Sequence, residues 1–301
     1  MIEDVVIEDA GIEDAVIEDA ETGNGRKGDR IMTDLGNKVL VSVAPVAATD
    51  RVIIPEKIAE DVYECYKAGA AMVHLHVRDK EGQLTPDMTL LNETLTMIRR
   101  DSDIVIEVST GGVSNLTIEE RCAPLYSDFV EACSLNVGST NLGKAVYCNP
   151  IDDVEYCIRE ILKQKKTPEV ETFEIGHTWT MEQLMKKYEF VDPVLFSIVL
   201  GHEGEAPATP QALAAMIQMI PAGAIWGITQ ARRTDFSLLA GAIGMGAKTV
   251  RVGFEDSCYL DPLTQAKTNG PIVEKTVAML RAMDKEPMTP EEARTFFRIG
   301  R

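Results

Sequence analysis

The stretch "VLVSVAPVAATD", residues 39–50, decides between the two folds that the rest of the chain allows. Its first part, VLVSVAPV, is a short β-branched run that predicts a buried strand. The loop that follows, APVAATD, contains no glycine. An open doubly wound sheet normally places a glycine-rich phosphate loop directly after its first strand. This stretch therefore favours a closed barrel.

The remaining sequence alternates between strand-like runs and segments with helical spacing. Apolar residues at 58, 62, 65 and 66 form one helical stripe that Gly69 can end. Thr209-Pro210 is a good N-cap for another helix, and further helices are predicted near 272–284 and after Thr289-Pro290. Strands are predicted at 39–46, 72–78, 103–109, 132–137, 168–174, 194–200, 224–229 and 249–254. Eight such units over residues 36–301 match the length of a (β/α)8 TIM barrel, usually ~250 residues.

Residues 1–35 differ from the rest of the chain. Ile-Glu-Asp recurs there with a five-residue period, and the first twenty-two residues hold nine acids and no bases. A five-residue period gives neither a helix nor a strand a continuous apolar face. We predict a disordered, acidic low-complexity extension, either a solubilising tail or a site for a basic partner.

Composition excludes several classes of partner. The chain has 48 acidic and 30 basic residues, a net charge of −18, which repels nucleic acid. No apolar run approaches the ~18 residues of a membrane span, and no secretory signal pattern opens the chain. The six cysteines are scattered without a C-x-x-C pair, so we expect reduced thiols in a cytoplasmic protein.

The strand ends carry a candidate metal site. His74 and His76 lie two residues apart and so share one face of their strand. Glu255 follows the last strand, which lies across the first strand from the histidine pair in a closed barrel. Two histidines and a carboxylate form a ligand set for catalytic zinc, and also for ferrous iron. Two hydrogen-bonded interior histidines, with Glu255 ion-paired to Arg251 or Arg78, remain the alternative.

Other strand ends are also polar. The "STGG" of residues 109–112 offers a hydroxyl and free backbone N–H groups that suit a carboxylate, although Gly-Gly is equally consistent with a tight turn. Further polar residues follow the fourth, fifth and sixth strands: Ser134, Asn136, Ser139, Asn141, Glu169, Glu171, His177 and His202. Polar side chains at most strand ends predict an active site at one mouth of the barrel.

With these motifs in order, the sequence resembles the β-keto acid cleavage enzymes. The resemblance runs from about residue 38 to 295 and rests on "HLHVRD", "STGG", "SLNVGS", "PEVETFE" and "VRVGFED". It implies a zinc-dependent TIM barrel, usually a homotetramer. Such enzymes cleave a β-keto acid using acetyl-CoA, and the products are acetoacetate and the CoA ester of the remaining fragment.

The resemblance also implies roles for individual residues. The family's glutamate that can pair with an amino substrate is replaced here by Thr49, so the resemblance does not carry an amino substrate over. Arg232 and Arg233 could meet CoA phosphates, or form surface ion pairs. The zinc ligands correspond to His74, His76 and Glu255, the catalytic base to Asp256 with Arg251 and Ser109, and substrate contacts to Thr49, Thr110, Gly111, Gly112, Ser134 and Glu171.

Two other functions fit parts of the sequence. An amidohydrolase-like metal-dependent hydrolase is also a barrel with an H-x-H pair, and His177, His202 and Asp256 would complete its ligands. That pattern requires the H-x-H on the first strand, whereas here an earlier strand precedes it. A non-catalytic binding protein acting through the acidic extension would not need polar residues at the strand ends.

Overall fold

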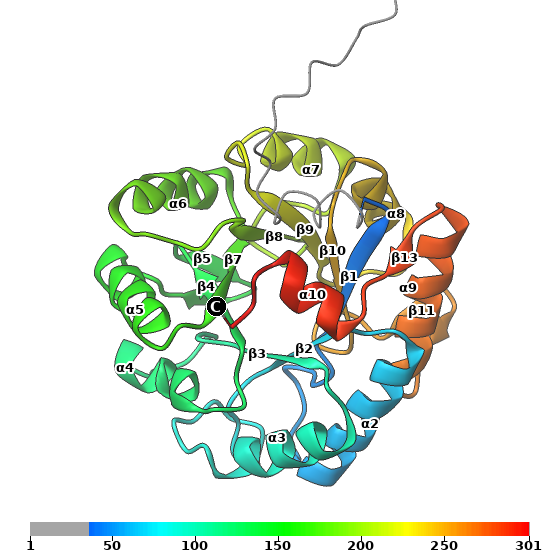
Figure 1. Cartoon of the computed structure of the whole chain (residues 1–301), viewed down its shortest axis with the longest axis horizontal. Coiled ribbons are helices and arrows are strands. Elements are labelled where there is room, and N and C mark those ends of the chain that lie inside the picture. Colours follow the sequence, from blue (N-terminus) through cyan, green and yellow to red (C-terminus); the bar gives the residue numbers. More distant parts are fainter. Residues whose placement is uncertain (1–35, 301) are drawn as a thin grey trace, which may run out of the picture. The chain divides into compact units, whose positions relative to one another are not determined.

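The fold of residues 36–300, which the computed structural model describes, is a closed ring of eight parallel strands. Neighbouring strands pair in the order β10-β9-β8-β7-β4-β3-β2-β1, and β1 also pairs with β10 to close the ring (Figure 1). The predicted TIM barrel is confirmed. The eight strands are β1 (Lys38–Val43), β2 (Met72–Leu75), β3 (Val105–Val108), β4 (Ala132–Asn136), β7 (Thr167–Thr172), β8 (Leu195–Leu200), β9 (Ile225–Gln230) and β10 (Thr249–Val252).

The strands are shorter than the apolar runs that predicted them. β2 ends at Leu75, so His76 and Arg78 lie just beyond it rather than on it. β10 ends at Val252, which puts Glu255 in the loop that follows. The candidate ligands therefore lie at and immediately after the carboxyl ends of the strands, where a TIM barrel carries its chemistry.

Helices cover the outside of the ring, and local signals explain their ends. Gly69 ends α2 in the left-handed conformation, with φ 110°, and its N–H bonds to the last turn. The Thr209 side chain caps α7 by accepting the Ala212 N–H. The outer elements are α2 (Pro55–Ala68), α3 (Thr89–Asp101), α4 (Ile118–Arg121), the 3-10 turn η1 (Ala123–Tyr126), α5 (Ile151–Lys163), α6 (Ile175–Lys187), α7 (Pro210–Ile217), α8 (Ser237–Gly244) and α9 (Gly270–Ala282).

Helix α10 (Pro290–Phe296) closes one end of the barrel. In Figure 1 it lies across the ring of strands. Phe296 and Phe297 are buried in a cluster that includes Leu40 of β1 and Met72 of β2, near the amino ends of those strands. The end of the barrel at the carboxyl side of the strands is not covered by α10.

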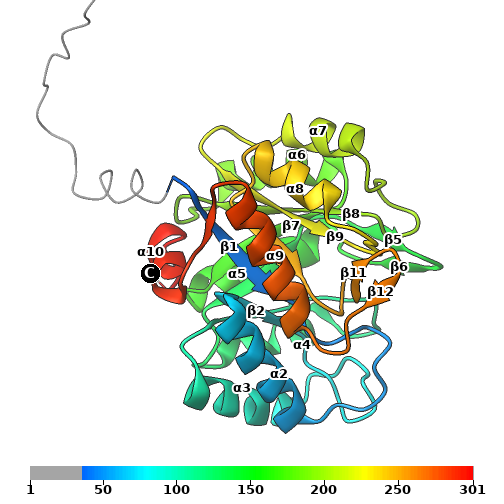
Figure 2. The same ribbon diagram turned by 90° about the vertical axis from the view of Figure 1, so that its right-hand side faces the viewer.

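Two hairpins that the sequence did not predict lie away from α10, near the carboxyl ends of the strands (Figure 2). They are β5 (Thr140–Leu142) with β6 (Ala145–Tyr147), and β11 (Tyr259–Asp261) with β12 (Thr264–Gln265). The short β13 (Glu286–Pro287) adds to the outer edge of β1. Among the described residues, every helix is too short or too polar to span a membrane. The predicted acidic extension, residues 1–35, lies outside the described residues.

Candidate functional site

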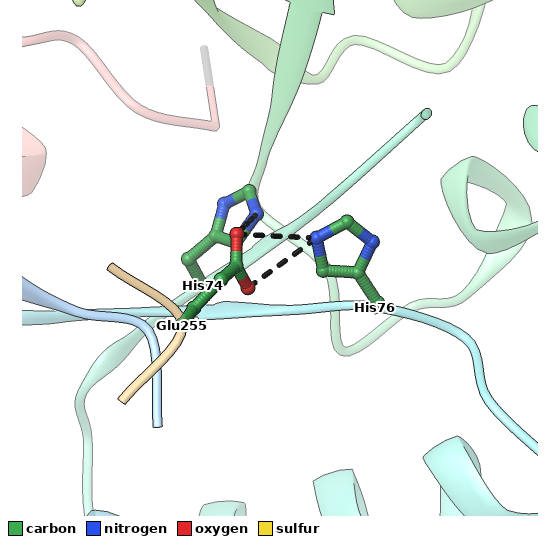
Figure 3. A group of neighbouring side chains, drawn as sticks. All are labelled: His74, His76 and Glu255. Atoms are coloured by element: carbon green, nitrogen blue, oxygen red, sulfur yellow. Dashed lines mark hydrogen bonds and ion pairs between the residues drawn. The ribbon is translucent and has the colours of Figure 1, made fainter. Parts of the chain in front are cut away.

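His74, His76 and Glu255 meet at the mouth of the barrel. The Nε2 atom of His76 lies 3.4 Å from both carboxylate oxygens of Glu255, and Nε2 of His74 lies 3.9 Å from Oε1. Figure 3 shows the carboxylate between the two imidazoles. One ligand atom from each residue falls within 4.8 Å of the others. The structure thus brings together the three residues that the sequence grouped.

A tight turn after β10 carries Glu255 to the histidines. Gly253 has φ 131°, and a Cβ at that position would lie 2.3 Å from the carbonyl oxygen of Ala44. Only glycine therefore allows the chain to cross so closely over the end of β1. The Glu255 N–H then donates to the same Ala44 carbonyl at 3.1 Å. This crossing puts Glu255 above β1, facing the histidines on the other side.

Glu107 on β3 holds His74 from behind, and the sequence interpretation did not identify it. His74 and Glu107 face each other in the parallel pairing of β2 and β3, with His74 Nδ1 3.2 Å from Glu107 Oε2. A carboxylate on Nδ1 directs the Nε2 lone pair of a histidine toward a metal. The signal in the sequence was an acid within the apolar run VIEV, on the strand next to the histidines.

Glu107 in turn contacts Glu169, a buried residue of β7. Glu107 Oε1 and Glu169 Oε2 have no N–H or O–H partner among the described residues, so a proton between the two carboxyl groups is what can satisfy both. Burial raises the pKa of both groups, and the neighbouring charge of Glu107 raises the pKa of Glu169 further. Glu169 is therefore the protonated partner that donates to Glu107.

Arg251 joins the carboxylates of the site. Its Nε and Nη2 donate to Asp256 at 3.1 and 2.8 Å, its Nη1 donates to Glu171 at 2.8 Å, and Nη2 lies 3.4 Å from Glu255. Burial alone would raise the pKa of Glu255, but attraction to His76, His74 and Arg251 outweighs burial and holds this pKa well below its usual range. Glu255 is thus ionised, as a metal-binding carboxylate must be.

The donor set fits a divalent metal ion. Two imidazole nitrogens and one ionised carboxylate converge, and His74 is oriented by Glu107 in the way that a metal-bound histidine requires. The Nε2 atom of His76 lies on the side of Glu255 and is the nitrogen that would face the ion. Zinc and ferrous iron both accept these three ligands and leave positions for a substrate.

A cavity of about 750 Å³ opens beside this group. Of the residues predicted from the sequence, the three metal ligands, Ser109, Gly112, Glu171 and Arg251 line the cavity. Thr49, Thr110, Gly111, Ser134 and Asp256 do not line it. Thr49 is exposed, whereas its neighbours Ala48 and Arg51 do line the cavity.

Thr110, Gly111 and Ser134 shape the wall of the cavity from behind. Thr110 Oγ1 donates to the Ser134 carbonyl at 2.7 Å, and the Thr110 N–H donates to Ser134 Oγ at 3.3 Å. A Cβ on Gly111 would fall 1.4 Å from the hydroxyl of Tyr147, so only glycine fits. These contacts fix the loop that presents Ser109 and Gly112.

The remaining candidates have different positions. His177 accepts the Phe173 N–H at 3.3 Å and lies away from the cavity, whereas His202 lines the cavity; burial lowers the pKa of both. Arg233 is buried and stacks on Phe236 at 3.9 Å, so it is no surface ion pair. Arg232 lines the cavity. Neither histidine joins the three-ligand group, and the hydrolase pattern lacks its ligands within residues 36–300.

Comparison with known proteins adds to this geometry. The family described as beta-keto acid cleavage enzyme matches residues 48–299. The 3-keto-5-aminohexanoate cleavage enzyme of Fusobacterium nucleatum is 34% identical over 241 residues, 79% of this chain and 87% of the relative. The 3-dehydrocarnitine:acetyl-CoA trimethylamine transferase of Rhizobium meliloti is 30% identical over 290 residues, 86% of this chain and 96% of the relative. ObcA with oxaloacetate has the same fold, with a TM-score of 0.72 over 83% of this chain and 67% of its own, at 19% identity.

Proposed function

The chain belongs to the beta-keto acid cleavage enzyme family, and we propose that it uses zinc and acetyl-CoA to cleave a 3-keto acid. The products are acetoacetate and the CoA ester of the fragment that carried the keto group. Relatives named for acetyl-CoA-dependent transfers support the co-substrate. The observation that carries the proposal is the group of His74, His76 and Glu255, whose ligand atoms lie within 4.8 Å of one another beside the cavity.

In the proposed reaction, the zinc ion and Asp256 have different roles. A zinc ion held by the three ligands would polarise the C3 carbonyl of the keto acid and make its C2 protons more acidic. Asp256 is the base that takes one of these protons. Arg251 holds both oxygens of Asp256, and its bond to Glu171 fixes the guanidinium in turn. Asp256 does not line the cavity, so this role requires its carboxylate to turn toward the substrate.

The bonds and protons balance without a covalent intermediate on the protein. C2 of the deprotonated keto acid forms a bond to the acetyl carbonyl carbon, and the CoA thiolate leaves. The thiolate then attacks C3 of the adduct, and the C2–C3 bond breaks. The proton held by Asp256 returns to C2 of the acetoacetate fragment. The reaction therefore needs no nucleophilic serine or cysteine. This agrees with the cavity lining, in which no serine or cysteine is hydrogen-bonded to a histidine.

Ser109 and Gly112 are suited to the carboxylate of the keto acid. Both line the cavity, and the Ser109 hydroxyl stands next to the turn that Gly111 and Gly112 form. The Ser109 hydroxyl can donate to a carboxylate without adding a charge to the crowded site, whereas the Thr110 and Gly111 N–H groups already donate to Ser134 and Ser109.

The test is the formation of acetoacetate. Zinc-loaded protein, acetyl-CoA and a panel of 3-keto acids are incubated, and acetoacetate and the new acyl-CoA are measured together. The two products should appear in equal amounts from at least one keto acid. Hydrolysis of an amide or lactone with no acetoacetate from any keto acid would instead support the metal-dependent hydrolase.

Two neighbouring substitutions separate metal binding from proton transfer. Glu255→Gln should lower the zinc content of the purified protein, because it replaces an ionised ligand by a neutral amide. Asp256→Asn should keep the zinc content and lose turnover by about 10²–10⁴-fold, the usual contribution of a general base. A fully metallated Glu255→Gln protein would contradict the ligand assignment.

A further inference from the structure

Two arginines that enter the cavity have no acidic partner among residues 36–300. Arg51, in the loop after β1, and Arg78, in the loop after β2, both line the cavity. Arg51 Nη1 meets only the backbone carbonyls of Ala48 and Asp50, at 3.4 and 3.3 Å. Arg78 Nη1 donates to the carbonyl of Gly82 at 2.8 Å. Within residues 36–300 neither guanidinium is paired with a carboxylate, in a chain that carries 18 more acids than bases.

Arg78 is built into the wall of the cavity rather than loosely exposed. It is 8% exposed, and its Nε is buried without a partner among the described residues. Burial lowers the pKa of Arg78, the nearby charges of Glu255 and Asp50 raise it, and the charge of Arg51 lowers it. Two like charges that line the same cavity, neither of them in a salt bridge within residues 36–300, indicate a place where an anion is expected.

Close packing of the two loops holds the arginines in position. The Ile53 N–H donates to the Lys80 carbonyl at 3.1 Å. Gly82, with φ 78°, lies so close to Asp50 that a Cβ would be 2.0 Å from its carbonyl oxygen. The loops therefore form one unit, and the charges are preorganised for a ligand.

Within the described residues, no other charged side chain around the cavity forms a salt bridge with Arg51 or Arg78. Arg251 already binds Asp256, Glu171 and Glu255. Asp50 accepts the Ala47 N–H at 3.0 Å with its carboxylate. Glu203 and Arg232, which also line the cavity, come from the loops after β8 and β9 on the other side of the ring.

We propose that Arg51 and Arg78 form an anion subsite that binds a second carboxylate at the far end of the keto acid. The substrate is then a dicarboxylic 3-keto acid, an inference that rests on the proposed function. Arg78 follows the ligand His76 by two residues and is close enough to Glu255 to interact with its charge. This proximity favours the keto acid over the CoA phosphates, which the whole pantetheine arm separates from the reacting thioester.

Three six-carbon keto acids test the charge at the end of the substrate that is far from the C1 carboxylate. They are 3-oxoadipate, 3-oxohexanoate and 3-keto-5-aminohexanoate, in which that end is anionic, uncharged and cationic. The wild type should use 3-oxoadipate with a kcat/KM about 10–100-fold above the other two, as expected for a charge-assisted pair. Arg51→Gln should remove most of this preference through KM and leave the rate with 3-oxohexanoate within about twofold. Arg51 is exposed, so its replacement should not disturb folding.

Arg232→Gln is the matched control, because it removes an exposed arginine from the opposite wall of the same cavity. It should keep the preference for 3-oxoadipate. An equal loss in both variants would mean a general effect of charge and overturn the subsite. If Arg51→Gln instead raised the KM for acetyl-CoA and affected all three keto acids alike, the anion would be a CoA phosphate and the keto-acid assignment would fail.

Binding of unreactive acids separates this inference from the proposed function. Calorimetry with adipate and hexanoate needs no turnover. Adipate should bind the wild type about tenfold or more tightly than hexanoate, and Arg51→Gln should abolish the difference. That result would support the subsite even if no acetoacetate formed, whereas equal binding of the two acids would overturn it whatever the activity.

Discussion

At the scale of single residues, the contact between His74 and Glu107 should control the affinity of the proposed metal site. Glu107 fixes the imidazole through Nδ1, and the protonated carboxyl group of Glu169 donates a hydrogen bond to Glu107. Glu107→Gln replaces a charged acceptor by a weaker neutral one, so we expect zinc affinity to fall by about 10–100-fold, as for other such partners of a metal-bound histidine. Competition with a chelator measures the change.

Glu169→Gln is the control for this prediction. Because Glu169 is the protonated partner, an amide N–H can replace its O–H donor to Glu107, and zinc affinity should change little. If both variants lost the metal equally, the two carboxyl groups would share the negative charge, and the assignment of Glu169 as donor would be wrong.

The residues that could be predicted from the sequence are those whose spacing carries the information. His74 and His76 lie two residues apart at the end of β2, and Glu255 follows the strand on the other side of β1, so their spacing and the strand order group them. Glu107 was missed because its role depends on the register between β2 and β3, which no local pattern specifies. Arg51 was missed because the conformation of its loop decides which side chain faces the cavity.

At the scale of elements, one buried side chain ties together the loops that carry the site. Asn269, at the start of α9, is fully buried. Its Oδ1 accepts the Phe254 N–H at 2.8 Å, and its Nδ2 donates to the Pro45 carbonyl at 3.0 Å and to Asp61 at 2.6 Å. The loop after β10, the loop after β1 and α2 are thereby joined directly beside Glu255.

Replacing Asn269 should therefore affect both stability and metal binding. Asn269→Leu keeps the approximate size but leaves buried polar groups unpaired, which costs roughly 1–3 kcal/mol of unfolding free energy for each group. The turn before Glu255 loses its anchor, so zinc affinity should fall by about tenfold. Denaturant unfolding and chelator competition measure the two effects.

Leu280→Ala in the same helix is the comparison for Asn269. It creates a cavity in the core and should cost about 2–5 kcal/mol of unfolding free energy, and it lies near the end of α9 that is opposite to Asn269. Its zinc affinity should equal that of the wild type. If Leu280→Ala weakened zinc binding as much as Asn269→Leu, the loss would follow global stability and not the anchored loop.

The elements that could be predicted from the sequence have a strong period or a cap. The eight barrel strands are almost entirely buried, so most of them are rich in apolar and β-branched residues. The ends of α2 and α7 are marked by Gly69 and Thr209. The hairpins β5–β6 and β11–β12 were missed because their strands are two or three residues long and partly exposed. Segments of that length carry no measurable period.

At the scale of the whole barrel, stability and chemistry lie at opposite ends. The cluster of α10 fills the end at the amino side of the strands, while the metal ligands and the cavity lie at the carboxyl side. In TIM barrels generally, the loops at the carboxyl ends of the strands carry the active site, and the residues at the amino ends contribute to stability. A substitution under α10 should thus change unfolding without changing the site.

Phe297→Ala tests this separation. Phe297 is 1% exposed and packs edge-to-face against Phe296, with ring centroids 4.9 Å apart. Removing the ring leaves a cavity, and we expect the unfolding free energy to fall by about 3–5 kcal/mol. Zinc affinity and kcat, measured well below the unfolding transition, should stay at wild-type values.

Leu263→Ala, at a hairpin position 96% exposed, is the control and should change the free energy of unfolding by less than about 0.5 kcal/mol. A Phe297→Ala protein that remained folded but lost zinc would show that packing under α10 reaches the carboxyl ends of the strands, because the barrel then transmits strain along its length and the two ends are not independent.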